Sequence, residues 1–172
     1  MKKHPAHDLP HFSDGSMGIF FVTGTNYLHK KIIGKSHDRL DEFMVRMIDA
    51  IESVNFELHA FCVMPNHYHI IVDGTGVEIL RTALGKVHGL TSRKWNLEDD
   101  QVGRKVWFRA FDRQITSNRS YYSILNYIHY NPVKACLCKR ITEWSWSSAE
   151  IYIKGIGKDH ATSLWKEYPP AK

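Results

Sequence analysis

Cysteine is scarce in this sequence. The three cysteines, Cys62, Cys136 and Cys138, do not have the CxxC spacing of redox or zinc sites. Such a small, odd set fits free thiols in a reducing compartment. Long apolar runs are also absent: no stretch approaches the ~20 residues that span a bilayer, and residues 1–15 lack the apolar segment of a signal peptide. We therefore expect a cytoplasmic protein with no membrane partner.

Negative charge is scarce in the middle of the chain. Residues 79–140 carry 12 Lys and Arg against 4 Asp and Glu, net +8, whereas residues 1–78 carry 7 against 10, net −3. Basic groups neutralise phosphates and aromatic faces stack on unpaired bases, so this basic and aromatic segment predicts contact with single-stranded nucleic acid. A solvated basic surface around buried aromatics is the alternative. The residues predicted to bind nucleic acid are Arg93, Lys94, Arg104, Lys105, Trp107, Arg109, Arg113 and Arg119.

The length of 172 residues, with 43% hydrophobic residues, is sufficient for one domain with its own core. We expect an irregular arm over residues 1–16, a single domain over residues 17–153 and a C-terminal tail over residues 154–172. Alternating and β-branched runs predict strands over residues 19–23, 56–64, 67–72 and 106–111. Apolar residues at helical spacing predict helices from about Ser36 to Val54, from Val77 to Trp95, and from about Ser117 to Asn131. Pro132 is expected to end or kink the last helix.

The order of these segments is β-α-β-β-α-β-α, which predicts the α+β class. It matches the ferredoxin-like plan (βαββαβ), a four-stranded antiparallel sheet with helices on one face. The helix after the fourth strand is additional and carries several tyrosines.

Two histidines one residue apart, His67 and His69, stand at the start of the strand that contains Ile70-Ile71-Val72. Side chains alternate across a strand, so both imidazoles project from the same face while Tyr68 points to the other. Two imidazoles held side by side can bind one divalent ion. Histidines at such positions are also ordinary polar residues on half-buried strands, and the pair alone does not decide between these interpretations.

Tyr127 and Asn131 lie one turn apart on the same face of the last helix. A tyrosine hydroxyl can attack phosphorus and hold the product as a covalent ester. An ion on His67 and His69 would polarise the phosphate, and Asn131 would add an oxygen ligand. Mixed nitrogen and oxygen ligands suit Mg²⁺ or Mn²⁺, although imidazole also tolerates Zn²⁺. Helical spacing does not separate Tyr127 from the other tyrosines of this helix, Tyr121, Tyr122 and Tyr130.

Four stretches together resemble a known family. His67-Tyr68-His69 resembles the His-hydrophobic-His signature of HUH endonucleases, and residues 126–135 (NYIHYNPVKA) resemble the tyrosine helix of single-tyrosine transposases. Residues 60–69, with their Met-Pro-Asn-His turn, and residues 144–148 (WSWSS) are similar to further elements of the family. The likeness is closest to the REP-associated tyrosine transposases and covers most of residues 17–152.

The resemblance implies a metal-dependent endonuclease and strand transferase that acts on single-stranded or hairpin DNA. Such proteins cut and rejoin single strands near hairpins through a 5′-phosphotyrosine and leave a free 3′-hydroxyl. Tyr127 would be the nucleophile, His67 and His69 the metal ligands, and Asn131 the polar group one turn after the tyrosine. Insertion-sequence transposases act as dimers whereas REP-associated members can be monomeric, so a homodimer stays open.

Two alternatives remain at this stage. A non-catalytic regulator that binds DNA or RNA hairpins and retains the fold also explains the basic segment, but it does not need the His pair and Tyr127 together. A small zinc hydrolase would use the same His pair, but it has no evident third His, Asp or Glu ligand and leaves the basic and aromatic segment unexplained.

Overall fold

The computed structural model describes residues 18–108 and 110–170. The arm predicted over residues 1–16, and Arg109, lie outside the described residues. The strands are β1 (Gly18–Thr25), β2 (Glu57–Val63), β3 (His67–Gly74) and β4 (Phe111–Ile115). The helices are α1 (His37–Ser53), α2 (Val77–Glu98), α3 (Asn118–Lys134), α4 (Ala149–Ile156) and α5 (Lys158–Glu167), with 3₁₀ turns η1 (Tyr27–His29), η2 (Ile33–Lys35) and η3 (Ile141–Glu143). Within the described part of the chain, none of the helices combines the length and apolarity needed to cross a membrane.

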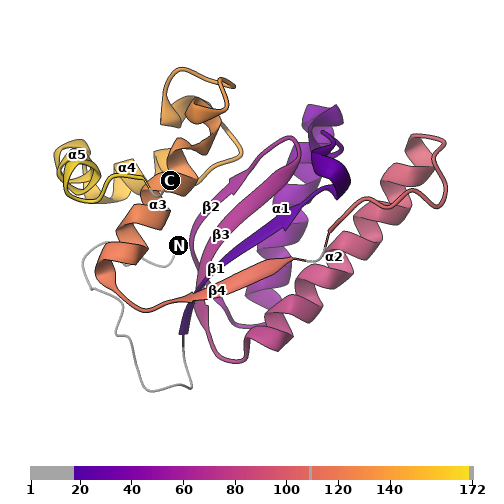
Figure 1. The fold of residues 1–172 in the computed structure, drawn as a ribbon, viewed down its shortest axis with the longest axis horizontal. Coiled ribbons are helices and arrows are strands. Elements are labelled where there is room, and N and C mark those ends of the chain that lie inside the picture. Colours follow the sequence, from indigo (N-terminus) through magenta and orange to yellow (C-terminus); the bar gives the residue numbers. More distant parts are fainter. Residues whose placement is uncertain (1–17, 109, 171–172) are drawn as a thin grey trace.

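The four strands form one antiparallel sheet in the order β2-β3-β1-β4. The predicted ferredoxin-like α+β fold is therefore confirmed. α1 and α2 cover one face of this sheet, and α3 lies against the opposite face (Figure 1). Of the predicted C-terminal tail, residues 154–156 belong to α4 and residues 158–167 form α5, which packs on α3.

Two sequence-based boundaries are wrong. The fourth strand was expected at residues 106–111, but Phe111–Ile115 pairs with β1 instead. Val106 and Trp107 form an apolar run that packs in the core beneath α2 without belonging to a strand. β4 is an edge strand with largely exposed and mostly polar side chains, so its sequence lacks the apolar pattern by which a strand is predicted. α3 also continues through Pro132 to Lys134 rather than ending before it.

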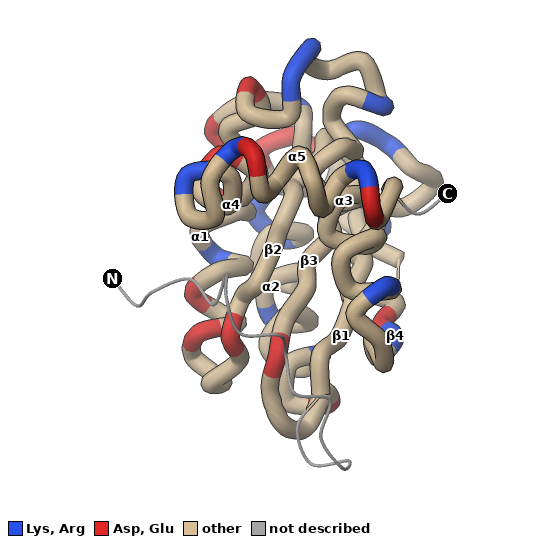
Figure 2. The backbone as a smooth tube through the Cα atoms, turned by 90° about the vertical axis from the view of Figure 1, so that its left-hand side faces the viewer, with Lys and Arg blue, Asp and Glu red and all other residues tan. Residues whose placement is uncertain are grey.

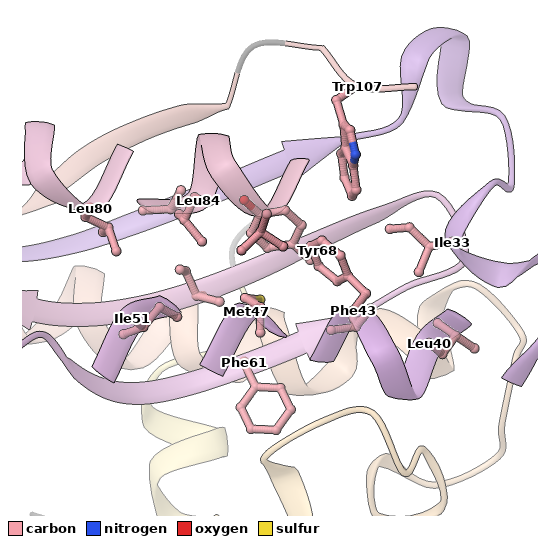
Figure 3. Close-up of a cluster of buried hydrophobic side chains, with 14 of the residues drawn as sticks. Ile33, Leu40, Phe43, Met47, Ile51, Phe61, Tyr68, Leu80, Leu84 and Trp107 are labelled. Carbon is pink, nitrogen blue, oxygen red and sulfur yellow. The ribbon is translucent and has the colours of Figure 1, made fainter. Parts of the chain in front are cut away.

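The larger core lies between the sheet and the pair α1 and α2. Figure 3 shows Phe43 and Met47 of α1 and Leu84 of α2 meeting Tyr68 of β3. The Tyr68 ring lies over Gly24, its antiparallel partner on β1, where a Cβ atom would come within 2.1 Å of the ring. Glycine at this position therefore makes room for the aromatic ring between the two histidines.

The segment between Trp144 and Ser148 lies along the outer edge of β2. The Val63 amide donates to the Trp146 carbonyl (2.8 Å), and the Trp144 indole donates to the Val63 carbonyl (2.9 Å). These bonds satisfy backbone groups that an edge strand would leave unpaired. The Ser148 hydroxyl also contacts Nε2 of His129 at 2.9 Å, which connects this edge to α3.

A buried ion pair joins α1 to the end of α2. Arg39 Nη2 lies 2.6 Å from Asp99 Oδ1, and Lys35 and Arg104 contact the same carboxylate. The Arg39 guanidinium, assisted by the other two cations, holds the pKa of Asp99 well below its ordinary value of 3.8. Because this pKa is lowered in the folded state, the carboxylate contributes stability above its ordinary pKa and loses that contribution as pH falls through the acid range.

Replacing the Asp99 carboxylate with an amide removes the more buried of the two carboxylates that contact the Arg39 guanidinium, and leaves only the half-exposed Glu98 as its charge partner. We expect Asp99→Asn to lower the free energy of unfolding at pH 7 by about 3 kcal/mol. The difference from the unsubstituted protein should narrow below about pH 4, because the Asp99 carboxylate of the unfolded chain then binds a proton that the folded state still excludes. Urea unfolding at several pH values measures both effects, and a difference independent of pH would contradict the argument.

Candidate active site

The two histidines of β3 face α3. His67 and His69 project from the same side of the strand as Ile71, which packs in the core beneath α3, while Tyr68 points toward α1. The imidazole centroids are 4.8 Å apart, and the His69 side chain is buried. The register of the sheet thus places both rings, side by side, under the tyrosine-bearing helix.

Tyr127 reaches this pair from α3. Its Oη atom lies 3.5 Å from Nε2 of His69, and the two ring centroids are 5.3 Å apart. This is a long contact, of the kind that tightens when a substrate binds.

The other tyrosines of α3 have different surroundings. Tyr121 is buried, with its hydroxyl 3.1 Å from Nδ1 of His59. Tyr122 stacks on Tyr168, and the Tyr130 ring packs edge-on against Trp165. Helical spacing left four tyrosines equivalent, and the tertiary structure brings Tyr127 to the His pair.

The remaining nitrogen of each imidazole is held by a polar side chain. Nδ1 of His67 lies 2.7 Å from Oδ1 of Asn66, and Nδ1 of His69 lies 2.8 Å from Oγ1 of Thr23. An amide oxygen only accepts hydrogen bonds, so Nδ1 of His67 carries the proton. If the Tyr127 hydroxyl donates to Nε2 of His69, the proton of His69 is likewise on Nδ1. Both Nε2 atoms are then unprotonated, which is the form of imidazole that can bind a metal ion.

Both imidazoles are neutral near pH 7. Burial, with repulsion from His29, lowers the pKa of His67 to about 4. Burial, with repulsion from His67, lowers the pKa of His69 to about 3. A low-dielectric position disfavours imidazolium, so the lone pairs are available without competition from protons.

Asn131 completes the group one turn after Tyr127. It is 7% exposed and interacts with His67, and its Nδ2 atom is buried without a hydrogen-bond partner. A buried amide with an unsatisfied end is expensive unless a ligand completes its surroundings. Within the described residues no group of three or more His, Cys, Asp or Glu side chains can hold a metal ion. Two imidazole nitrogens and one amide oxygen could serve as donors to a divalent ion at this position.

A cationic side chain is separated from the His pair by one aromatic ring. Phe21 of β1 stacks on His69 with centroids 5.4 Å apart, and the Arg113 guanidinium of β4 lies 5.7 Å from the Phe21 ring centre. Arg113 is exposed on the face that α3 partly covers. The arrangement places one guanidinium where a phosphate near the histidines can meet it.

The predicted nucleic-acid-binding residues separate into two groups. Arg93 and Lys94 lie on α2, across the sheet from the His pair; Lys94 contacts Glu42, and Arg104 contacts Asp99. Trp107 is buried, stacks on His88 and donates to Thr91, so its ring is unavailable to a base. Lys105, Arg113 and Arg119 are exposed. Seen from the side of α3, α4 and α5, basic and acidic residues are interspersed (Figure 2).

Thr23, Asn66 and Phe21 were not predicted as site residues. Thr23 is the antiparallel partner of His69 on β1, and Asn66 belongs to the turn just before β3. Asn66 is adjacent to His67 in sequence, which was an available signal. Nothing in the sequence pairs Thr23 or Phe21 with residues some fifty positions away, because strand register is a tertiary property.

Comparisons with known proteins bear on the family and the fold. Residues 15–131 match the family model described as Transposase IS200 like. A Haemophilus influenzae protein described as a REP-associated tyrosine transposase is 28% identical over 156 residues, covering 81% of this chain and 88% of that protein. The fold is similar to that of a solved REP-associated tyrosine transposase bound to a REP hairpin, with a TM-score of 0.61, 17% identity, and coverage of 96% of this chain and 92% of that one. The family resemblance seen in the sequence is confirmed.

The Thr23 hydroxyl is expected to stabilise the Nδ1–H tautomer of His69, because it can accept a hydrogen bond from that nitrogen while Tyr127 donates to Nε2. Thr23→Val keeps the shape but removes the oxygen that Nδ1 contacts, so the proton should distribute over both ring nitrogens. Thr23→Ser retains the oxygen and should retain a single tautomer. Long-range ¹H–¹⁵N correlation spectra of the imidazoles measure the populations, and an unchanged His69 spectrum in Thr23→Val would contradict the assignment.

Proposed function

The chain belongs to the IS200-like transposase family, and on this premise we propose that it cuts and rejoins single-stranded DNA near hairpins through a covalent 5′-phosphotyrosine on Tyr127. The observation that carries the proposal is the approach of the Tyr127 hydroxyl to His69, beside a second neutral imidazole. A phenol, two lone-pair nitrogens and a buried amide suit phosphoryl transfer better than acyl transfer, because no Ser or Cys nucleophile contributes to this group.

Tyr127 supplies the nucleophile. Its Oη forms a bond to phosphorus while the bond from phosphorus to the 3′-oxygen breaks, and the phenolic proton is transferred, through solvent or a neighbouring base, to the departing 3′-oxygen. The products are a tyrosine ester of the 5′-phosphate and a free 3′-hydroxyl. One phosphodiester replaces another, so attack by a second 3′-hydroxyl reverses the step and rejoins strands without an external energy source.

His67 and His69 would hold a divalent ion, with Asn131 as the third ligand. Such an ion, when bound, supplies positive charge that polarises the scissile phosphate and offsets charge in the transition state. Asn66 and Thr23 orient the two imidazoles, so little rearrangement is needed to present both Nε2 atoms. Burial of the site limits competing water.

Hairpin DNA is the proposed partner. The structurally similar transposase is described as bound to a REP hairpin, and the middle of this chain has a net charge of +8. We propose that Lys105, Arg113 and Arg119 contact phosphates, because they are exposed and Arg113 lies over the Phe21 ring that stacks on His69. Lys94 and Arg104 are engaged in ion pairs with Glu42 and Asp99, and Trp107 is a core residue. We therefore leave these three out of the contact set.

The nucleophile is testable by trapping. Incubation with hairpin-bearing single-stranded oligonucleotides and Mn²⁺ should give a covalent adduct that survives denaturation. Tyr127→Phe should abolish the adduct, because the ring remains but the attacking oxygen is lost, while oligonucleotide affinity stays within about twofold. Tyr130→Phe, on the same helix, is the matched control and should react normally. Gel electrophoresis with a labelled oligonucleotide measures the adduct.

Two outcomes would contradict parts of the proposal. Normal cleavage by Tyr127→Phe would assign the nucleophile elsewhere. Tight hairpin binding with no adduct in the unsubstituted protein under any metal would favour the non-catalytic regulator, which retains the fold and the basic surface without the chemistry.

The metal ligands are testable separately from activity. His67→Ala should weaken Mn²⁺ binding, measured by calorimetry without DNA, by more than about tenfold, and chelation of divalent ions should abolish adduct formation. His37→Ala, an exposed histidine at the start of α1, is the control and should bind Mn²⁺ normally. Unchanged Mn²⁺ affinity in His67→Ala, with a normal thermal unfolding curve, would show that other groups bind the ion.

A further inference from the structure

An exposed group of aromatic and cationic side chains lies at the end of β1, beside the active site. Tyr27 and His29 belong to the turn η1, and Lys105 and Phe108 come from the connection between α2 and β4. We call these four residues the aromatic platform. Lys105 is already proposed to contact phosphate, but neither the family resemblance nor the proposed chemistry assigns a role to Tyr27, His29 or Phe108.

The rings of the platform contact one another and one ammonium group. The Tyr27 and Phe108 centroids are 4.8 Å apart, and His29 lies 6.5 Å from Phe108. The Lys105 Nζ atom lies 4.7 Å from the Tyr27 centroid and 5.7 Å from that of Phe108. Phe108 is 36% exposed, so an aromatic surface faces solvent.

The backbone beneath the platform is fixed. The Tyr27 amide donates to the Val106 carbonyl at 2.8 Å, and the Phe108 amide donates to the Thr25 carbonyl at 2.9 Å. His29 has a φ of 54°, a left-handed conformation that a residue other than glycine rarely adopts. Such conformations persist where the surrounding structure enforces them, often at binding sites.

Asn66 connects the platform to the active site. Its Nδ2 atom donates to the His29 carbonyl at 3.0 Å, and its Oδ1 atom lies 2.7 Å from Nδ1 of His67. A single side chain therefore contacts both the platform and one of the proposed metal ligands. The backbone of His29 is therefore separated from His67 by a single side chain.

We propose that the aromatic platform stacks an unpaired base next to the scissile phosphate, and that Lys105 binds a phosphate of the same strand. The proposal rests on the proposed function and adds a subsite to it. Within the described residues no ion pair involves Lys105, Lys30 or Lys31, so the charge beside the rings is not neutralised by a carboxylate. Rings and unneutralised cations together favour a single nucleic-acid strand.

The contact between Lys105 and the rings is compatible with this role. An ammonium group over exposed rings is weakly held, and base stacking on an aromatic side chain is generally stronger. A base can therefore take the position over the ring, while the flexible lysine side chain moves to the phosphate of that nucleotide. Because every base has an aromatic face, the platform would contribute affinity and register rather than base identity.

The experiment uses hairpin oligonucleotides with short single-stranded extensions on either side, each with one 2-aminopurine. Stacking quenches 2-aminopurine fluorescence, so quenching should occur at one position beside the scissile phosphate. Phe108→Ala should remove that quenching and weaken binding about tenfold. Phe108→Trp should restore both, which separates loss of stacking from loss of fold. Leu97→Ala, which removes a 63% exposed apolar side chain from α2, is the control and should change neither.

The outcomes separate this proposal from the one on which it rests. Unchanged quenching and affinity in Phe108→Ala, with adduct formation still normal, would overturn the platform and leave the tyrosine chemistry intact. Quenching lost in Phe108→Ala and restored in Phe108→Trp, in a protein that forms no adduct, would support the platform and overturn the chemistry. Lys105→Met should reduce the dependence of oligonucleotide affinity on salt concentration. An unchanged dependence would show that Lys105 does not bind a phosphate.

Discussion

The register of β3 between β1 and β2 is the constraint on which the site depends. A shift of one residue would turn His67 and His69 toward α1 and α2 and bring Tyr68 under α3. Buried side chains on both faces oppose that shift, because Tyr68 fills the space above Gly24 while Ile71 packs beneath α3. The same hydrophobic packing that stabilises the sheet therefore fixes which way the imidazoles face.

Burial then determines the chemistry that the imidazoles can perform. In water they would be partly protonated near neutral pH, but the core lowers both pKa values far enough that the rings stay neutral. Asn66 and Thr23 hold the Nδ1 atoms, so two lone pairs face the tyrosine helix. Asn131 lies at one side of this group, and its amide nitrogen lacks a hydrogen-bond partner. The Nδ1 atoms have hydrogen-bond partners whereas the Asn131 amide nitrogen has none, and such an unpaired polar group is what a bound ligand can complete.

One face of the sheet is mainly structural, and the other carries the candidate active site. On the face covered by α1 and α2, aromatic residues such as Trp107 and the buried pair of Arg39 and Asp99 maintain the structure. On the face toward α3, rings and cations remain accessible beside His69, as Arg113 and Phe21 illustrate. Basic residues that are close in sequence thus separate into structural ion pairs and groups available to phosphate.

The sequence by itself determined the α+β plan, the shared face of His67 and His69, and the helix that carries Tyr127, because periodicity and residue type are local properties. It misplaced β4, since an apolar run that fills the core looks like a strand and an exposed edge strand does not. The family resemblance singled out Tyr127 among the tyrosines of its helix, but only the tertiary structure decided that its hydroxyl approaches His69 and that Thr23 contacts the same ring. These contacts join residues dozens of positions apart, and strand register and helix docking, which no local pattern encodes, bring them together.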